Sequence, residues 1–443
     1  MVTGLTTPRS GRHSNRDRRN RDNRDRPYRD DRDRDYGDDR DRGYGDDHER
    51  RNRNDRPRGR WGRKRHGRGR IRRLVRKPWV RVVLGGFGVF LLVVSWSVGH
   101  ALTVPGGGSV SERLAEWARD HYLGPLVTFG EWISYSPPKA GGKPSFALTG
   151  PSANVTSRPK ATGPVQIYGP PPPLKSMAGK PLPGEGKWRV LGVVNGNPAI
   201  YGTYLRASNV YTSYVVGIAS MNQSLLRFQL RPGAEDPGPG NWKLPAEIPP
   251  PARRGLEATF NGGFKISVSG GGFYLNGATA GRLTRGTASV VYYKDGHIAI
   301  GNWGQTVHMT PDVVGVRQNL HLIVQNGKVP ASVNYNVESA WGATLGGGYY
   351  VWRSGIGITS DGRVIFAYGP SLNVSELADV LKEAGAVTAM QLDINPDWMS
   401  YMYYFPGNHP ADPTPHNLLP DQIQPPDRFY SLASRDFTAV YAR

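Results

Sequence analysis

The chain has 443 residues and no cysteine, so disulfides, thiolate zinc sites and a cysteine nucleophile are all excluded. Its charge is uneven: residues 1–78 hold 28 Lys/Arg against 14 Asp/Glu, a net charge of +14, whereas the whole chain carries +21. Residues 79–443 therefore carry only +7 (21 − 14), and the basic balance says little about what the folded part binds.

Residues 1–78 are predicted to form a disordered tail. The stretch 14–60 consists almost entirely of Arg, Asp, Asn and Gly, and a segment with so few apolar side chains cannot bury enough surface to fold. An Arg-rich tail can bind nucleic acid electrostatically. Here acidic residues alternate with the arginines, and few aromatic residues are available for stacking, so we expect no nucleic-acid partner.

A membrane anchor is predicted at residues 79–104. The stretch 82–104 contains no Asp, Glu, Lys or Arg, and it exceeds the ~20 residues that a helix needs to cross a bilayer core. A cleaved signal peptide would lie nearer the N-terminus, so we expect an uncleaved anchor. Residues 60–81 include eleven Lys/Arg and no acid, which favours a cytoplasmic N-terminus and binding to anionic lipids. We therefore expect a single-pass plasma membrane protein with an extracytoplasmic C-terminal domain.

Residues 105–185 are predicted to connect the anchor to the folded domain. Residues 111–122 fit a short amphipathic helix, which would pack against the domain or the membrane surface. Residues 136–184 are rich in Pro and Gly, a composition typical of an extended spacer. The folded domain is therefore expected to comprise residues 186–443.

The domain is predicted to be α+β and dominated by mixed β-sheet. Strand-like segments flank three turns that favour β-hairpins, at Asp295-Gly296, Asn326-Gly327 and Asp361-Gly362. A helix is predicted at residues 373–384, because Asn373 and Glu376 fit a capping box and apolar residues follow at helical spacing. The sequence "AVTAMQL" then predicts a buried strand that ends at Asp393.

The polar residues after this strand are the first candidate site. Asp393, Asn395 and Asp397 fall within five residues, and two carboxylates so close repel each other unless a partner lies between them. Open sheets often present ligand-binding groups at strand ends. The alternative is structural, an Asx-turn before Pro396.

Four segments, taken in order, resemble the phosphodiester glycosidase family, which includes the enzyme that uncovers mannose 6-phosphate by removing N-acetylglucosamine. They are "ATFNGGFK" (258–265), "GVRQNLHLIVQNGKV" (315–329), "WRSGIGITSDGRVIFAYG" (352–369) with the helix and strand that follow, and "RDFTAVYAR" (435–443). No single motif is specific, whereas four in order at suitable distances are. Over residues 187–443 the pattern is most similar to a membrane-anchored bacterial branch of the family.

The resemblance implies a glycoside hydrolase that cleaves a sugar-1-phosphodiester, or a related glycosidic bond, in cell-envelope glycans. Asp393 would act as acid or base, Arg353 would bind phosphate through its planar guanidinium, and Asn261 would offer its amide to an anionic oxygen. Further substrate-binding candidates are Gly262, Gly263, Arg285, Arg317, Asn395, Asp397 and Trp398. The alternatives are a surface arginine for Arg353 and a plain tight turn for the Asn261 loop.

The sequence also departs from the family's pattern. The family usually has a glycine-rich run and a Ser or Thr after the strand-end Asp, whereas this chain has "LDINPDWMS". The last strand has Phe437-Thr438 where an Asn is usual. These differences favour the rival function, a non-catalytic glycan- or phosphoglycan-binding envelope module that keeps the fold.

Other tryptophans and three histidines are further candidates for ligand-binding groups. Tryptophan can stack on a sugar but more often fills a core, and this applies to Trp303, Trp341 and Trp352. The histidines His297, His308 and His321 do not have the spacing of metal ligands. We therefore predict no metal site and no cofactor, and the sequence leaves the involvement of a divalent cation open.

Overall fold

The computed structural model describes residues 77–103, 110–124, 126–127, 136–150, 168–334, 338–342 and 349–443. All but the last two residues of the predicted tail, and most of the predicted basic block, lie outside these residues.

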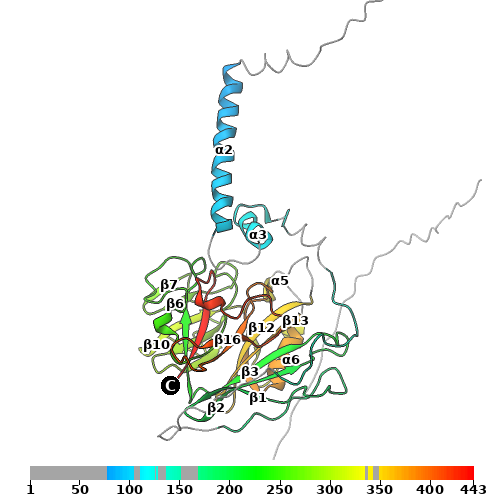
Figure 1. The fold of residues 1–443 in the computed structure, drawn as a ribbon. Helices are drawn as coiled ribbons and strands as arrows, with labels where there is room; N and C mark the ends of the chain where they lie inside the picture. Colours follow the sequence, from blue (N-terminus) through cyan, green and yellow to red (C-terminus); the bar gives the residue numbers. More distant parts are fainter. Residues whose placement is uncertain are drawn as a thin grey trace, which may run out of the picture. The chain divides into compact units, whose positions relative to one another are not determined.

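Helix α2 (Pro78–Thr103) forms at the predicted anchor (Figure 1). Its 26 residues rise by about 39 Å at 1.5 Å per residue, which exceeds the ~30 Å hydrocarbon core of a bilayer. By length and composition, α2 can therefore cross a membrane. Helix α3 (Val110–Asp120) follows at the position of the predicted amphipathic helix.

The largest sheet has seven strands, and each is antiparallel to its neighbours. In spatial order these are β1 (Arg189–Val194), β2 (Asn197–Leu205), β3 (Val216–Met221), β13 (Val364–Leu372), β12 (Val351–Thr359), β14 (Ala386–Gln391) and β11 (Leu322–Val324). The predicted turn at Asp361-Gly362 joins β12 to β13 as a hairpin. The turn at Asn326-Gly327 closes only on a bridge between Gln325 and Lys328, because β11 pairs with β14 instead.

Two further sheets have five antiparallel strands each. One has the order β7 (Ala278–Ala280), β6 (Phe273–Leu275), β10 (Val313–Gln318), β8 (Ala288–Tyr293) and β9 (Ile298–Asn302). The other has the order β16 (Thr414–Asn417), β15 (Tyr401–Phe405), β5 (Leu256–Asn261), β17 (Phe437–Ala442) and β4 (Leu226–Arg231). The predicted turn at Asp295-Gly296 joins β8 to β9. The short helical elements are η1 (Pro250–Ala252), η2 (Ala331–Asn334), α5 (Glu338–Trp341) and η4 (Arg428–Tyr430).

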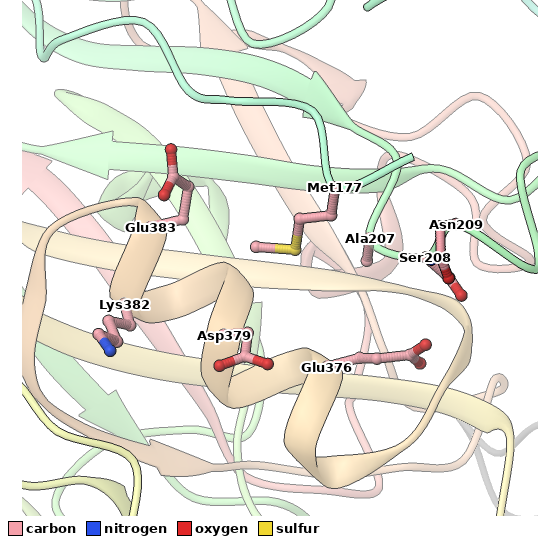
Figure 2. Close-up of a pocket in the computed structure, with 8 residues that line it drawn as sticks. All are labelled: Met177, Ala207, Ser208, Asn209, Glu376, Asp379, Lys382 and Glu383. Atoms are coloured by element: carbon pink, nitrogen blue, oxygen red, sulfur yellow. The ribbon is translucent and has the colours of Figure 1, made fainter. Parts of the chain in front are cut away.

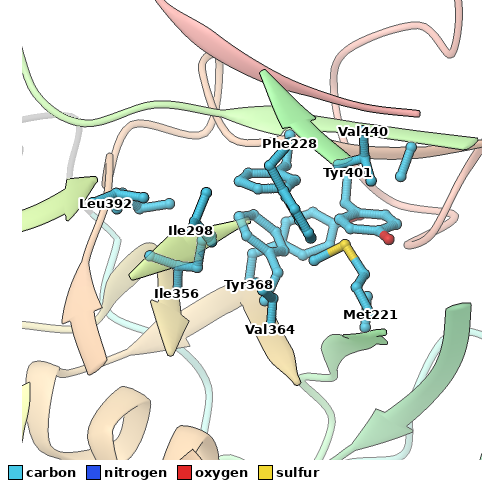
Figure 3. Packing of buried hydrophobic residues seen from close by; sticks show 14 of the residues in the cluster. Met221, Phe228, Ile298, Ile356, Val364, Tyr368, Leu392, Tyr401 and Val440 are labelled. Carbon is cyan, nitrogen blue, oxygen red and sulfur yellow. The ribbon is translucent and has the colours of Figure 1, made fainter. Parts of the chain in front are cut away.

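The main hydrophobic core lies where side chains of the three sheets meet (Figure 3). Ile356 and Tyr368 come from the seven-stranded sheet, Ile298 from β9, and Phe228 and Val440 from β4 and β17. Each such side chain contributes about 1.5–3 kcal/mol by leaving water. One shared core therefore fixes the three sheets against one another.

Helix α6 (Val374–Glu383) covers one face of the seven-stranded sheet (Figure 1). It begins with the predicted capping box: the Asn373 side chain accepts a hydrogen bond from the Glu376 backbone, and the Glu376 side chain accepts one from the Asn373 backbone. Its apolar stripe is buried against Val216, Ile365 and their neighbours in a second core. The α+β, sheet-dominated prediction is therefore confirmed.

The structure differs from the prediction of an extended spacer at residues 136–184, because several of these residues are buried in the domain. Among the described residues of 136–185, Leu148 is 2 % exposed and belongs to the main core, and Leu174 is buried in the second core with the apolar residues of α6. Arg206 donates hydrogen bonds to both carboxylate oxygens of Glu185, at 2.9–3.1 Å. Burial raises the pKa of Glu185, but the hydrogen bonds that its carboxylate accepts from Arg206, Leu182 and Ser176 together outweigh burial, so the pKa is lowered. These residues belong to the domain, so its start lies well before residue 186.

We expect a chain that begins at residue 186 to be much less stable than one that begins at residue 136. The shorter chain loses Leu148 and Leu174, at about 2–5 kcal/mol for each buried side chain. It also leaves Arg206 buried without Glu185, at about 3–5 kcal/mol. Thermal unfolding of the two fragments measures the difference. Melting temperatures within about 2 °C of each other would contradict the assignment of these residues to the domain.

Candidate functional site

Residues from strands of two different sheets meet at Asp393. Asn261 is the last residue of β5, Ser354 lies in β12, and Asp393 follows the end of β14. The Asn261 amide nitrogen donates to Ser354 Oγ (3.0 Å), and this hydroxyl donates to the Asp393 carbonyl (2.8 Å). The Asp393 backbone N–H donates to the Gly262 carbonyl at 3.2 Å. The structure therefore brings together two of the three predicted catalytic residues.

The Asp393 side chain is buried and has a raised pKa. It is 5 % exposed. The next residue, Ile394, packs with Phe264 and Leu320 in a small apolar cluster. Burial raises the pKa of the carboxyl, while Arg435 and the N–H groups of Asn395 and Ile394 oppose the shift. Asp393 Oδ1 accepts hydrogen bonds from the Ile394 N–H at 2.7 Å and from the Asn395 N–H at 3.1 Å. A carboxyl with a raised pKa at a strand end is suited to proton transfer.

The Asn261-Gly-Gly-Phe loop is held closely by neighbouring chain segments. A Cβ on Gly262 would lie 2.0 Å from Asp436 Oδ2, and a Cβ on Gly263 would lie 3.1 Å from the Asn319 amide carbon. The Gly262 N–H donates to the Asp436 carbonyl at 3.0 Å. Gly262 is therefore required by the close approach of Asp436, whereas a side chain at position 263 would require the Asn319 side chain to shift. Both glycines thus have a structural role in this loop.

Arg317 is held in a buried ion-pair network instead of pointing to open solvent. Its Nε donates to Asp436 Oδ2 (2.9 Å), its Nη1 donates to the Gln318 carbonyl (2.8 Å), and its Nη2 donates to the Phe264 carbonyl. Asp236 lies 3.8 Å away. Burial raises the pKa of Asp436 to about 6, although Arg317 opposes this. Arg317 therefore fixes β10 to the start of β17 and to the Asn261 loop.

Arg435 is a cation beside Asp393 that the sequence analysis did not single out. Of the charged groups that lower the pKa of Asp393, Arg435 has the largest effect. Its guanidinium carbon lies 4.9 Å from the Trp398 ring centroid, and that of Arg428 lies 5.5 Å away. The signal was available, since Arg435 opens the segment "RDFTAVYAR" that carries the family resemblance.

Trp398 does not offer a face to a sugar in this arrangement. It is buried, and two guanidinium groups lie against its ring. Trp341 is also buried, and Trp303 and Trp352 are half-buried and pack on apolar clusters. The candidate substrate-binding ring of Trp398 is therefore occupied by cation–π contacts with Arg428 and Arg435.

Arg353 lies on a different side of β12 from Ser354, as consecutive residues of a strand do. Its guanidinium donates to the Leu372 carbonyl (2.9 Å), Gln391 Oε1 (2.7 Å) and the Tyr349 carbonyl (3.3 Å). Burial lowers the pKa of Arg353 to about 10, and Glu376 of α6 opposes this. These contacts tie β12 to β13 and β14, so the structure does not bring this guanidinium together with Asp393 and Asn261.

The remaining candidates lie at the edge of the cluster or outside it. The side chain of Asn395 accepts a hydrogen bond from the Asp397 N–H at 3.0 Å, which is the Asx-turn expected before Pro396. Asn395 and Asp397 are half-buried. Arg285 is exposed, and its side chain lies beside Gly304. Within the described residues no group of three or more His, Asp or Glu is arranged to hold a metal ion.

A cavity of about 570 Å³ lies between α6 and the segment that follows β2 (Figure 2). Its lining comprises Met177, Ala207, Ser208, Asn209, Glu376, Asp379, Lys382 and Glu383. Burial raises the pKa of both Glu376 and Asp379. Two of the acids have structural partners: Glu376 caps α6, and Glu383 accepts a hydrogen bond from the Lys175 N–H. None of the predicted site residues lines this cavity.

Several solved structures are similar to part of the chain. The structure of the zebrafish N-acetylglucosamine-1-phosphodiester alpha-N-acetylglucosaminidase catalytic domain, auto-inhibited by pro-peptide, is similar at 14% identity. The match covers 58% of this chain and 88% of that chain, with a TM-score of 0.36. A hypothetical protein from Synechocystis is similar at 12% identity over 56% of this chain and 63% of that chain, with a TM-score of 0.29.

A comparison with curated proteins gave no match. The family model described as phosphodiester glycosidase matches residues 254–393, a range that begins just before β5 and ends at Asp393. Asn261, Arg317 and Arg353 also lie within it, whereas Arg435 and Asp436 lie beyond it. The chain therefore carries a domain of the phosphodiester glycosidase family at residues 254–393.

Proposed function

We propose that this protein is a membrane-anchored hydrolase that cleaves a sugar-1-phosphodiester on the extracytoplasmic side of the membrane. The family match suggests a hydrolase of the phosphodiester glycosidase type. The observation that carries the proposal is Asp393, a buried strand-end carboxyl with a raised pKa beside a guanidinium, at the end of the matched domain. Cell-envelope glycans or glycolipids would supply such a bond.

In the proposed reaction, water attacks the anomeric carbon and the bond from that carbon to the phosphate oxygen breaks. The products are a free sugar and a phosphomonoester. A phosphomonoester has a second pKa of about 6, so it can leave without being protonated. The attacking water does need to lose a proton, and we assign the Asp393 carboxylate as the base that accepts it. No cofactor enters this scheme.

The phosphate requires a cation near Asp393, and we assign this role to Arg435. A guanidinium matches two phosphate oxygens at once, and Trp398 holds that of Arg435 from one side. Arg353, the sequence-based candidate, is instead assigned to holding β12. Arg435 can therefore neutralise charge on the leaving phosphate while Asp393 activates the water.

Asn261 is assigned a positioning role. Its amide nitrogen donates to the Gly262 carbonyl (2.9 Å) and to Ser354 Oγ, and its oxygen accepts from the Ser400 N–H (3.2 Å). These bonds use both N–H groups of the amide. Asn261 therefore orients the backbone that carries Asp393 and does not itself bind the substrate.

The proposed location rests on α2. A largely apolar helix of 26 residues follows a basic segment, and the excess of Lys/Arg before it favours a cytoplasmic N-terminus. Residues after α2 would then lie outside the cell membrane. We propose a single-pass plasma membrane protein on these grounds.

Turnover in ¹⁸O-labelled water tests the proposed function. The full-length protein in detergent micelles is incubated with N-acetylglucosamine-1-phosphoryl methanol and the corresponding hexose compounds. We expect free reducing sugar and methyl phosphate, with the label in the sugar. Label in the phosphate, together with sugar-1-phosphate as product, would show a phosphodiesterase. Binding of these compounds without any turnover would support the rival, a non-catalytic glycan-binding module.

A further inference from the structure

The chain is attached to the domain soon after α3, which leaves a short tether. The Lys139 N–H donates to the Tyr214 hydroxyl (3.3 Å), and the Gly141 N–H donates to the Val210 carbonyl (2.7 Å). Thr212 Oγ1 donates to the Gly142 carbonyl at 2.9 Å. From Val127 to Lys139 a fully extended chain spans at most about 40 Å, at ~3.5 Å per residue. By comparison, the extended spacer that the sequence predicts at residues 136–184 would allow the domain to lie up to about 150 Å from α3, at ~3.1 Å per residue.

The segment between α2 and this tether exposes large apolar side chains. Val110 is 64 % exposed, Tyr122 96 % and Leu126 68 %, and Leu114 and Leu123 are also exposed. Soluble surfaces rarely gather such side chains without a partner that covers them. We call residues 110–127 the interfacial segment.

The interfacial segment contacts the C-terminal end of the apolar helix. Trp117 Nε1 donates to Ser97 Oγ at 2.9 Å, and Arg113 Nη1 donates to the Leu102 carbonyl at 2.5 Å. Arg113 thereby satisfies one of the carbonyls that the end of α2 leaves without an intrahelical partner. If α2 crosses the bilayer, its last two turns lie at the membrane–water boundary. Trp and Tyr are enriched at that depth because their rings are apolar and their polar atoms reach water.

We infer that the interfacial segment docks in the headgroup layer of the bilayer and holds the glycosidase domain close to the lipid surface. The occupant of its apolar face is the membrane, because the segment is joined by hydrogen bonds to α2, which also exposes large apolar side chains. Burial of apolar side chains in that layer contributes free energy in proportion to their area. The inference rests on the proposed membrane anchoring, and it does not depend on the proposed reaction.

Site-specific fluorescence in vesicles tests this docking. The chain has no cysteine, so Leu114→Cys and Leu126→Cys can each carry one environment-sensitive dye in the full-length protein. The control is Arg119→Cys, an exposed position about 140° around the helix from Leu114. A second control on the domain is Ile423→Cys, an exposed apolar position. The protein is reconstituted in phosphatidylcholine–phosphatidylglycerol vesicles that contain a lipid-attached quencher.

We expect quenching of the dyes at Leu114 and Leu126 to be at least about twofold stronger than at Arg119 and Ile423. It should remain when the protein is diluted in lipid. Equal quenching at all positions would overturn the inference. An apolar dye environment at Leu114 and Leu126 that is lost when the protein is diluted in lipid would also overturn it, since a second copy of the chain would then cover the face. Flotation with the vesicles is measured in parallel. If the protein floats with the vesicles but all positions are quenched equally, only the docking inference is contradicted. If the protein does not float, both the docking and the membrane anchoring are contradicted.

Discussion

Asp393→Asn is expected to lower kcat/KM by about 10²–10⁴-fold, because an amide cannot accept the proton that the attacking water must lose. The amide keeps an oxygen for the N–H groups of Ile394 and Asn395, which now donate to Asp393 Oδ1. The fold should therefore be retained, and thermal unfolding checks this. Steady-state kinetics on the sugar-1-phosphodiester that the protein cleaves measure the effect.

The pH dependence of the native enzyme gives a second reading of the same group. A base must be ionised to act, so the rate falls as pH drops through its pKa. Because burial raises the pKa of Asp393, the fall in rate on the acid side of the pH profile should lie above the ordinary pKa range of an Asp side chain.

Asp397→Asn is the matched control for Asp393→Asn. Asp397 is half-buried in the Asx-turn, and its variant should keep most of the activity. Equal losses in both variants would contradict the assignment of Asp393 as the base.

Arg317→Met is expected to cost about 3–5 kcal/mol of the free energy of unfolding. The guanidinium is the partner of the buried Asp436 carboxylate and lies near Asp236, and removal of one partner leaves an uncompensated buried charge. Because domains are stable by about 5–15 kcal/mol in total, the variant should be close to unfolding at physiological temperature. Urea denaturation followed by tryptophan fluorescence measures the change.

Arg285→Met provides the control for Arg317→Met, since it removes the same charge from an exposed side chain. Exposed substitutions away from such networks usually change stability by less than about 0.5 kcal/mol. If the two variants were equally stable, the Arg317–Asp436 network would not be holding β10 against the start of β17 and the Asn261 loop. If Arg317→Met unfolded but Arg285→Met abolished turnover, the phosphate-binding cation would have to be reassigned.

The candidate site could be predicted only in part. Asn261 and Asp393 lie at strand ends that the sequence marks, and the structure joins them through Ser354. Arg353 and Ser354 are neighbours in sequence, yet the pleat sends one to the α6 side of the sheet and the other to the cluster around Asp393. The sequence motif selects both Arg353 and Ser354, but it does not tell which of the two lies on the face of the sheet near Asp393.

The sequence by itself determined the elements whose signals are local. The Asp-Gly turns placed two hairpins, the Asn373 capping box and apolar spacing placed α6, and an uncharged run placed α2. Only the tertiary structure decided that Asp436 pairs with Arg317, 119 positions earlier in the chain, and that Leu148 belongs to the core. Such contacts form between segments far apart in sequence, and the free energy that selects them comes from packing and desolvation in the finished fold, which no local pattern of residues encodes.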